Sequence, residues 1–445
     1  MPPLRPMASA KAPMRRATAP RPPRTAVASV IMSSLSTPFA SGPLAGEVKG
    51  LGPGKLITLT SSAPQEIMRT ALVHTLFEEA GGGERLALEM YRALKDLGHE
   101  VDLYTAHVDD RAWEVLTSGM KGVPRPEVLG EPLTSRLLRR SGRLVRYRRL
   151  LTMGYLARYA EGLRQRYDVI VETQSNVPLR WADASYVHFP ALIDYMALQA
   201  RAGGLRRLYD WLVVRRARSL ADSTRPVMTN SSWTAEYVRK AYSSQRVYVV
   251  HPPVNVEELL PLGGDRGKIV LTVSRISPEK RLTAIAEVAR LVPEAEFYLV
   301  GSTSVYSGPV LREIRERAEG LRNFHLETDV PRKRILDLMS QASIYLHPPF
   351  AEHFGIAIAE AAAAGLAPVV YRDGGGWTDI VSRMDQGLGY TSVEEAAHII
   401  RSLLNDAERL KALSARAREV AKGFSYEAFR ARVNEVIRVL TAKEP

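Results

Sequence analysis

The stretch ASIYLHPPFAEHFGIAIAEAAAAGLAPVVYRD, from Ala342 to Asp373, decides the fold. Its first eight residues predict a strand, and FAEH predicts the loop after it. A helix is then expected to begin near Phe354–Gly355 and to end at Gly365, before LAPVVYRD forms another strand. Strand, helix and strand in this order are typical of a parallel sheet covered by helices.

Two glutamates stand in the otherwise apolar surroundings of this stretch. Glu352 lies in the predicted loop, where the dipole of the following helix favours a negative charge, and Glu360 lies inside the helix. A buried carboxylate is unfavourable unless it is paired or hydrogen-bonded. Hydroxyl groups of a polyhydroxylated ligand would satisfy both carboxylates. The alternative is one glutamate that caps the helix and one that is exposed.

The same alternation of short apolar runs and helical patterns continues through the chain from Met68 on. The runs include RTALVH, EVDLYT, YDVIVET and ASYVHF in the first half, and KIVLTVSR, AEFYLVGS and RNFHLET in the second. A Pro- and Gly-bearing segment without periodicity separates the two series. We therefore expect an α/β fold of two doubly wound, Rossmann-like domains that face a central cleft.

The expected boundaries follow from these changes of pattern. The first domain spans residues 66–252, the linker 253–266 and the second domain 267–424, and a last helix within 425–445 packs back on the first domain. Residues 1–65 are rich in Pro, Ala and Arg, which predicts a disordered basic tail. A transit peptide and a start codon placed too early are the alternatives for this segment.

Composition limits the chemistry that the chain can carry. The sequence has 445 residues, no cysteine and a formal net charge of +13. Disulfides, thiolate metal sites and a cysteine nucleophile are thereby excluded. The positive charge predicts an anionic partner, which can be nucleic acid, a phosphorylated substrate or an anionic membrane surface. No apolar run reaches the roughly 18–20 residues that a membrane-spanning helix needs.

Charged and glycine-rich motifs follow several of the predicted strands. SRISPEKR places Arg275 and Lys280 at a strand end, where an arginine fork and a lysine charge together suit a diphosphate. Its other two charges, Glu279 and Arg281, are expected on the solvated face of the helix. The alternative is that all four side chains are solvated charges on the surface, without a ligand.

Three further motifs have a structural alternative beside the functional one. GGGER, from Gly81 to Arg85, can bring backbone N–H groups close to an anion at a helix N-terminus, or can form a tight turn without a ligand. The glycines of RDGGGWTDI can approach a ligand or form a flexible loop. His188 ends the run YVHFP, and Ser231 or Ser232 in NSSWT is expected to cap a helix.

Taken in order, these motifs resemble those of the retaining glycosyltransferases of family four, which have the two-domain GT-B fold. The matching segments are GGGER, YVHFP, NSSWT, HPPV, EHFGIAIAE and the GGG segment that begins at Gly374. The resemblance is strongest to the subgroup of dolichol-pathway α-1,2-mannosyltransferases, which extend a lipid-linked glycan. It makes the first domain the acceptor side and the second the nucleotide-sugar side.

The resemblance implies a role for each matching residue. Arg275 and Lys280 would hold the donor diphosphate, Glu360 would bind the ribose, and Glu352 would contact the transferred sugar. The other residues implied to lie at the donor are Gly82, Gly83, His188, Phe354, Gly355 and Ile356. It also implies that the nucleotide-sugar is a substrate, that no cofactor or metal is needed, and that attack occurs on the face of the sugar that the diphosphate leaves. The choice between GDP-mannose and a UDP-sugar stays open.

The arginine-rich segment from Ser135 to Tyr167 is a second possible binding surface. Leucines and tyrosines alternate there with Arg136, Arg139, Arg140, Arg143, Arg146, Arg148 and Arg149. Such a surface suits anionic lipid headgroups and fits a cytoplasmic protein held peripherally on the cytoplasmic face of a membrane. A solvated helix face is the alternative, and an inactive module that binds nucleic acid or membrane is the competing function. No recognition motif for nucleic acid is present, so no nucleic-acid partner is expected.

Overall fold

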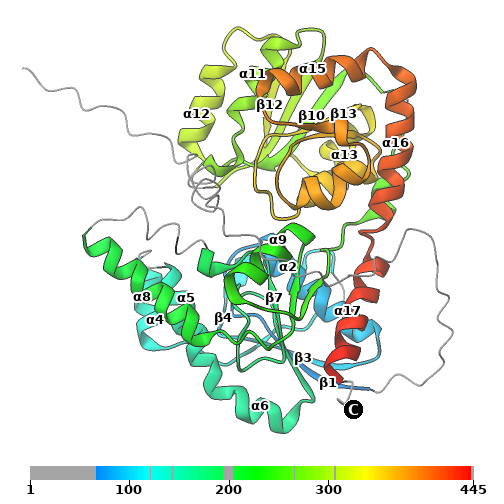
Figure 1. The fold of residues 1–445 in the computed structure, drawn as a ribbon. Coiled ribbons are helices and arrows are strands. Elements are labelled where there is room, and N and C mark those ends of the chain that lie inside the picture. Colours follow the sequence, from blue (N-terminus) through cyan, green and yellow to red (C-terminus); the bar gives the residue numbers. More distant parts are fainter. Residues whose placement is uncertain are drawn as a thin grey trace, which may run out of the picture.

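The computed structural model describes residues 67–441, except 121, 142–144, 194–195, 197–203, 265 and 305–306. The predicted basic tail, residues 1–65, lies outside the described residues. Two lobes, each built around a parallel sheet, lie one above the other, with the N-terminal lobe below (Figure 1). The predicted α/β architecture of two Rossmann-like domains is therefore confirmed.

The N-terminal lobe contains a seven-stranded parallel sheet in the order β5-β3-β1-β6-β7-β8-β9. In chain order its strands are β1 (Arg69–Val73), β3 (Glu100–Thr105), β5 (Glu127–Val128), β6 (Val169–Glu172), β7 (Ala184–Val187), β8 (Val227–Thr229) and β9 (Val247–Val249). At its centre, Leu72 lies opposite Leu103 and Val171. These strands are apolar runs because helices cover both faces of the sheet.

The helices of this lobe are α2 (Gly82–Asp96), α3 (Asp110–Thr117), α4 (Leu133–Ser141), α5 (Val145–Leu156), α6 (Ala160–Arg166), α8 (Leu205–Leu220) and α9 (Ser232–Tyr242). A small parallel pair, β2 (Leu76–Phe77) with β4 (His107–Val108), lies beyond the ends of β1 and β3. Helix α2 follows the predicted pattern, because Leu86, Leu88, Met90 and Leu94 are all buried.

The C-terminal lobe contains a six-stranded parallel sheet in the order β12-β11-β10-β13-β14-β15. Its strands are β10 (Ile269–Arg275), β11 (Glu296–Ser302), β12 (Phe324–Thr328), β13 (Ile344–His347), β14 (Ala367–Tyr371) and β15 (Gly389–Tyr390). The helices around it are α11 (Thr283–Leu291), α12 (Gly308–Arg317), α13 (Arg332–Gln341), α14 (Ile356–Ala363), α15 (Val393–Leu404) and α16 (Ala407–Lys422). The stretch from Ala342 to Asp373 forms β13, α14 and β14.

Both sheets reverse their strand order beside their first strand, between β1 and β6 and between β10 and β13. In doubly wound sheets a ligand binds beyond the carboxyl ends of the strands at this reversal. The segments that begin there are the loops after Val73, Glu172, Arg275 and His347. The topology thus brings four loops, two from each lobe, to one place.

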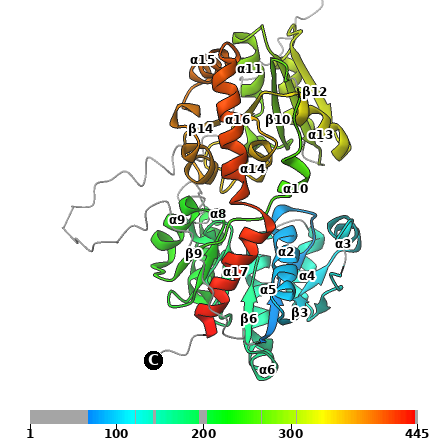
Figure 2. The ribbon, with the colours of Figure 1, turned by 90° about the vertical axis from the view of Figure 1, so that its right-hand side faces the viewer.

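The chain crosses between the lobes twice. The first crossing includes the short helix α10 (Val256–Leu259), in the segment expected to be a linker, and its Val254, Val256 and Leu259 are buried in the C-terminal core. The second leads from α16 to α17 (Tyr426–Thr441), which runs down to the N-terminal lobe and packs on α2 (Figure 2). Phe429, Val433, Val436 and Ile437 of α17 complete an N-terminal core cluster. Within the described residues, no helix has the length and apolarity to cross a bilayer.

Candidate active site

A cleft of about 740 Å³ lies where the four loops meet. Every residue singled out above for catalysis or donor binding lines it. The N-terminal lobe contributes Gly82, Gly83 and His188, and the C-terminal lobe contributes Arg275, Lys280, Glu352, Phe354, Gly355, Ile356 and Glu360. Their shared location is a finding, while the role of each residue remains a prediction.

Glu352 is the centre of a charged triad in the C-terminal wall. Its Oε2 accepts from Lys280 Nζ at 2.6 Å and from His347 Nε2 at 3.2 Å. Burial alone would raise the pKa of Glu352, but the hydrogen bond from His347 and the charge of Lys280 hold it well below its usual value. Burial lowers the pKa of His347, so a neutral imidazole donates this bond. Glu352 is therefore an ionised, oriented carboxylate.

The loop that carries Glu352 is held in place by backbone contacts with the second glycine-rich segment. Gly375 N donates to Glu352 O at 2.7 Å, and a Cβ at Gly375 would lie 2.1 Å from His353 O. Gly374 has a φ of +90°, and a Cβ there would lie 2.5 Å from Glu352 O. Only glycine allows this approach. The GGG segment thus supports the acid loop from behind, and is neither a ligand-facing loop nor a flexible one.

Glu360 lies one and a half turns into the following helix, and its partner is Arg332 at the start of α13. Arg332 Nη2 lies 3.0 Å from Glu360 Oε1 and 2.8 Å from Glu258 Oε2. Burial raises the pKa of Glu360, although the charge of Arg332 opposes the rise. The two glutamates of the opening stretch are both largely buried and paired, so neither is the exposed residue of the alternative reading.

The four charges of SRISPEKR separate in the structure. The side chain of Arg275 is 70% exposed and its closest acid, Glu279, is 3.9 Å away. Arg281, by contrast, is not on a solvated helix face: its guanidinium lies over the rings of Phe350 and Tyr371, at 4.5 and 5.4 Å from their centroids. Because Arg281 has a φ of +50°, the chain turns there: Lys280 reaches Glu352, whereas Arg281 lies over Phe350. Arg275 is therefore free to meet a ligand, and Arg281 supports the wall.

Neutral polar groups line the facing wall. His188 Nε2 donates to Thr173 O at 3.1 Å, and burial lowers the pKa of His188 to about 4. Asn176, beside it in the cleft, accepts from His188 N at 2.7 Å through Oδ1. Asn230 Nδ2 donates to His188 O at 2.9 Å. The imidazole is therefore neutral near pH 7 and is held by Thr173, while Asn176 and Asn230 hold the backbone of His188.

The first glycine-rich motif forms the N-terminus of α2 at the cleft. A Cβ on Gly81 would lie 2.7 Å from Glu84 Oε2, so the carboxylate of Glu84 sits directly over this turn. Burial raises the pKa of Glu84, and the backbone N–H groups of Glu84 and Gly81 oppose the rise. Gln174 Nε2 donates to Glu84 Oε1 at 3.4 Å. The positive end of α2 therefore already has an internal carboxylate, which competes with any anion of a ligand there.

The NSSWT motif joins the two lobes beside the cleft. Ser231 caps α9, as predicted for one of the two serines, because its Oγ accepts from Thr234 N. Ser232 N donates to Asp379 Oδ2 at 2.6 Å, and His251 Nε2 bonds the same oxygen at 2.8 Å. Ser231 Oγ also donates to His353 O. The motif is a seam across the lobes, with Asp379 completely buried in it.

Aromatic rings continue this seam. His353 stacks on Phe189 with ring centroids 4.6 Å apart and planes 1° apart, and Trp233 Nε1 donates to Asp373 Oδ1. Burial lowers the pKa of His353 to about 4. The seam is thus built from neutral rings and one buried carboxylate, which sets the relative position of the two walls.

Sequence reasoning missed Arg332, the partner of Glu360, and several residues that line the cleft, namely His347, Gln174, Asn176, Asn230 and Arg149. His347 carried a usable signal, because it ends a buried strand five residues before Glu352. Asn230 begins the NSSWT motif and Arg149 lies in the arginine-rich segment, but neither pattern pointed to the cleft, and the remaining residues have no motif around them. Among the described residues, no group of three or more histidine or acidic side chains could hold a metal ion.

Two family models match the chain, one on each lobe. Residues 80–258 match the model described as Glycosyltransferase Family 4, and residues 263–420 match the one described as Glycosyl transferases group 1. The boundary between the two matches falls at the first crossing between the lobes. Each lobe thus has the sequence signature of the corresponding half of one enzyme type.

Two similar relatives have the same name, GDP-Man:Man(3)GlcNAc(2)-PP-Dol alpha-1,2-mannosyltransferase. The Dictyostelium discoideum protein is 26% identical over 286 residues, which are 55% of this chain and 57% of the relative. The Neurospora crassa protein is 31% identical over 307 residues, 55% of this chain and 54% of the relative. The match thus spans little more than half the length of each relative.

Among solved structures, WaaG, a glycosyltransferase involved in lipopolysaccharide biosynthesis, has a similar fold. The TM-score is 0.59 at 16% sequence identity, and the match covers 84% of this chain and all of that one. At this identity the likeness concerns the fold, and it extends over both lobes and the cleft between them.

Proposed function

The chain belongs to the GT-B glycosyltransferases, and on that premise we propose that it transfers mannose from GDP-mannose to a lipid-linked glycan. The observation that carries the proposal is the cleft that joins Arg275, Lys280, Glu352 and Glu360 with His188 and the α2 turn of the other lobe. The names of the two relatives, which contain GDP-Man and PP-Dol, support this donor and this type of acceptor. Residues 67–441 include both lobes that such a reaction needs.

The proposed reaction depends on charge rather than on a protein nucleophile. Arg275 and Lys280 stabilise the diphosphate as it leaves, without need of a metal ion, and Glu360 accepts from ribose hydroxyls. Glu352, ionised and held by two donors, orients the hydroxyls of the transferred sugar. His188 is a poor base near pH 7, because burial lowers its pKa to about 4. The departing phosphate therefore takes the proton of the acceptor hydroxyl, and the configuration at the sugar is retained.

The base end of the cleft supports a guanine nucleotide. Asp329 follows β12 and lines the cleft, and its two oxygens accept from Thr303 N at 2.8 Å and from Thr303 Oγ1 at 2.6 Å. A carboxylate held in this way still has lone pairs for two donors. Guanine offers adjacent N1–H and N2–H groups, whereas uracil offers a single N–H on its pairing edge. We expect Asp329 to favour GDP over UDP.

This donor preference has a direct test. Asp329→Asn should weaken GDP binding about tenfold and leave UDP binding unchanged, because the amide cannot accept from both N–H groups of guanine with a full charge. The measurement is titration calorimetry with both nucleotides. Asp337→Asn, an exposed site on α13, is the matched control. Equal weakening of GDP and UDP, or of neither, would remove Asp329 from base recognition.

The lipid-linked acceptor would meet the protein at the helices α4, α5 and α8, which lie together on one side of the N-terminal lobe (Figure 1). Leu133 and Leu137 of α4 are 73% and 68% exposed, and Leu208 and Trp211 of α8 are 54% and 43% exposed. Arg215 lies over the Trp211 ring. Exposed apolar groups beside arginines suit the interface of an anionic membrane. Attachment to the cytoplasmic face of a membrane is part of the proposal.

The test of the proposed function is a donor panel with a membrane lipid extract as acceptor and mass spectrometry as readout. GDP-mannose should extend a lipid-linked glycan by one hexose, and UDP-glucose and UDP-N-acetylglucosamine should not. Extension from a UDP-sugar alone would mean a family-four transferase with another substrate. Binding of an oligonucleotide, without binding of any nucleotide-sugar, would refute the proposed transferase activity.

Membrane attachment is measured separately by sedimentation with vesicles. Binding should require anionic lipid, weaken as salt rises, and fall in a Leu208→Ser, Trp211→Ser variant. Equal binding to neutral vesicles, or none to either kind, would contradict a basic membrane-facing surface.

A further inference from the structure

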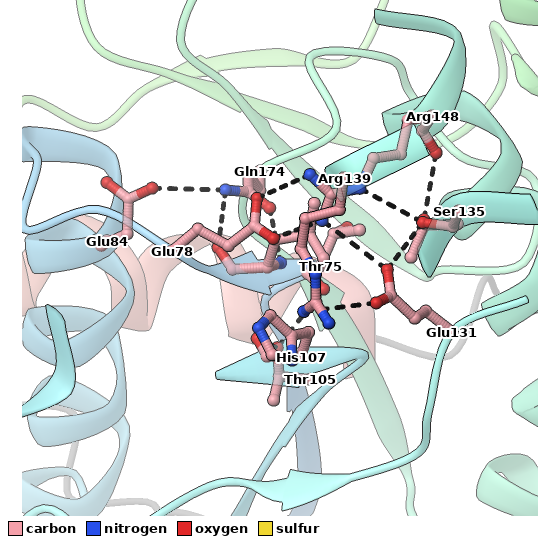
Figure 3. Close-up of polar contacts among 12 residues, drawn as sticks. Thr75, Glu78, Glu84, Thr105, His107, Glu131, Ser135, Arg139, Arg148 and Gln174 are labelled. Atoms are coloured by element: carbon pink, nitrogen blue, oxygen red, sulfur yellow. Dashed lines mark hydrogen bonds and ion pairs between the residues drawn. The ribbon is translucent and has the colours of Figure 1, made fainter. Parts of the chain in front are cut away.

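Two neighbouring arginines of α5 have opposite environments. The guanidinium of Arg148 is buried and engaged: it bonds both carboxylate oxygens of Glu78, lies 3.3 Å from Ser135 Oγ, and is 3.6 Å from Glu131 Oε2. Figure 3 shows this network, in which Arg139 also reaches Glu131. Arg148 thus has acids on two sides, and its contacts fix α5 against the loop that leads to the α2 turn.

Arg149, the next residue, lines the cleft. Its Nε is closed off from solvent and has no hydrogen-bond partner in the part of the chain that the structure describes. Because residues 148 and 149 point about 100° apart on a helix, the bonds of Arg148 turn Arg149 away from the network and toward the cleft. Among the described residues Arg149 forms no ion pair with an acid, so its charge at the cleft is available for an anionic group from outside the protein.

The acids that share this wall do not fill that need. Glu84 is held at the N-terminus of α2 by backbone N–H groups and bonds Gln174. Burial raises the pKa of Glu84, and the charge of Arg149 acts against the rise without a direct ion pair. On the opposite wall, Lys280 is already paired with Glu352. The cleft therefore holds few uncommitted cations among its described residues, and Arg149 faces Arg275 across it.

We propose that Arg149 binds a phosphate group that a substrate brings into the cleft. The inference rests on the proposed function, which supplies two phosphate sources, the donor diphosphate and the diphosphate of a lipid-linked acceptor. An arginine fork matches two phosphate oxygens. Arg149 would then bring the acceptor lobe into contact with substrate charge, and would draw the two walls together on binding.

The experiment compares Arg149→Gln, Arg149→Lys and the wild-type full chain. The matched control is Arg158→Gln, an exposed arginine of the same lobe that stacks on Tyr155. Calorimetry uses GDP, guanosine and inorganic diphosphate. Transfer assays use a diphosphate-linked glycan and the same glycan without phosphate. Thermal melts show that each variant is folded.

If the phosphate is that of the donor, Arg149→Gln should weaken GDP and diphosphate binding roughly ten- to hundredfold and leave guanosine binding unchanged. If it is that of the acceptor, GDP binding stays the same and KM rises by a similar factor for the phosphate-bearing acceptor alone. The lysine variant keeps the charge but loses the fork, so its loss should be smaller. If Arg149→Gln unfolds at a lower temperature than the wild type, Arg149→Lys serves for the same comparison.

Two outcomes overturn the inference: no change with any phosphate-bearing ligand, or an equal loss with the neutral ones. The proposed function fails in a different way. A wild-type protein that binds diphosphate through Arg149 but transfers no mannose would refute the transferase activity and leave the phosphate site standing. A wild type that transfers mannose while Arg149→Gln does so equally well would refute the phosphate site alone.

Discussion

The two walls of the cleft hold polar groups in different ways. The C-terminal wall carries charges in pairs: Lys280 with Glu352 and Arg332 with Glu360. The N-terminal wall presents neutral groups, such as His188 and Asn176, fixed by hydrogen bonds to the backbone, and its charges, among them Arg149 and Glu84, are not joined in ion pairs with each other. Paired charges suit the diphosphate and the ribose hydroxyls of a donor. Neutral polar groups suit the sugar hydroxyls of an acceptor. This difference agrees with the proposal that the C-terminal lobe receives the donor and the N-terminal lobe the acceptor.

The largest expected effect tests the charged wall. Lys280→Met should lower kcat roughly 10²–10³-fold, the range found when one preset charge-stabilising donor is lost from an active site. Lys268→Met, an exposed site before β10, is the matched control and should have wild-type activity. Steady-state transfer kinetics measure both, with circular dichroism to show folding. A Lys280→Met enzyme with near-normal kcat would mean that the Lys280–Glu352 pair is only structural.

The second prediction concerns the seam that holds the walls in register. Asp379→Ala removes a buried carboxylate from Ser232 N and His251, and should lower the free energy of unfolding by about 3 kcal/mol. Denaturant unfolding measures the loss. Asp385→Ala removes a partly exposed acid of the same lobe, bonded to Arg409, and should lose about 1 kcal/mol or less. If both variants lose the same free energy of unfolding, the contacts of Asp379 stabilise the protein no more than a surface ion pair does.

The smallest effect of a single substitution concerns the neutral rings of His188 and His353. Burial lowers the pKa of His188 and of His353 to about 4, whereas an unfolded histidine titrates near 6.5. The unfolded chain therefore binds protons first, and stability falls as pH drops from about 6.5 to about 4. Each histidine contributes up to about 1.4 kcal/mol per pH unit in this window.

Urea unfolding at pH 7 and pH 5 measures this slope. His353→Gln should flatten it, and His398→Gln, an exposed site on α15, should leave it unchanged. A wild-type stability that does not change over this window would mean that the two rings are not held neutral.

Much of the fold followed from the sequence because both sheets consist of apolar runs with clear turns. The donor wall was equally accessible, since Arg275, Lys280, Glu352 and Glu360 follow strand ends in recognisable motifs. The acceptor wall was accessible only in part: Gly82, Gly83 and His188 stand in motifs, whereas the local pattern around Gln174, Asn176 and Arg149 gives no sign of a shared cleft. Local sequence also misplaced Arg281, since its positive φ and its stacking on Phe350 depend on the packed loop.

The crossing of α17 has a consequence for how the protein is made. Phe429 and Val433 of this helix are buried beside Leu86 and Met90, which the ribosome produces hundreds of residues earlier. The first lobe to emerge during synthesis therefore keeps an apolar face open until the last helix is released. We expect the nascent chain to need a chaperone at that face, and the two lobes to mature together rather than one after the other.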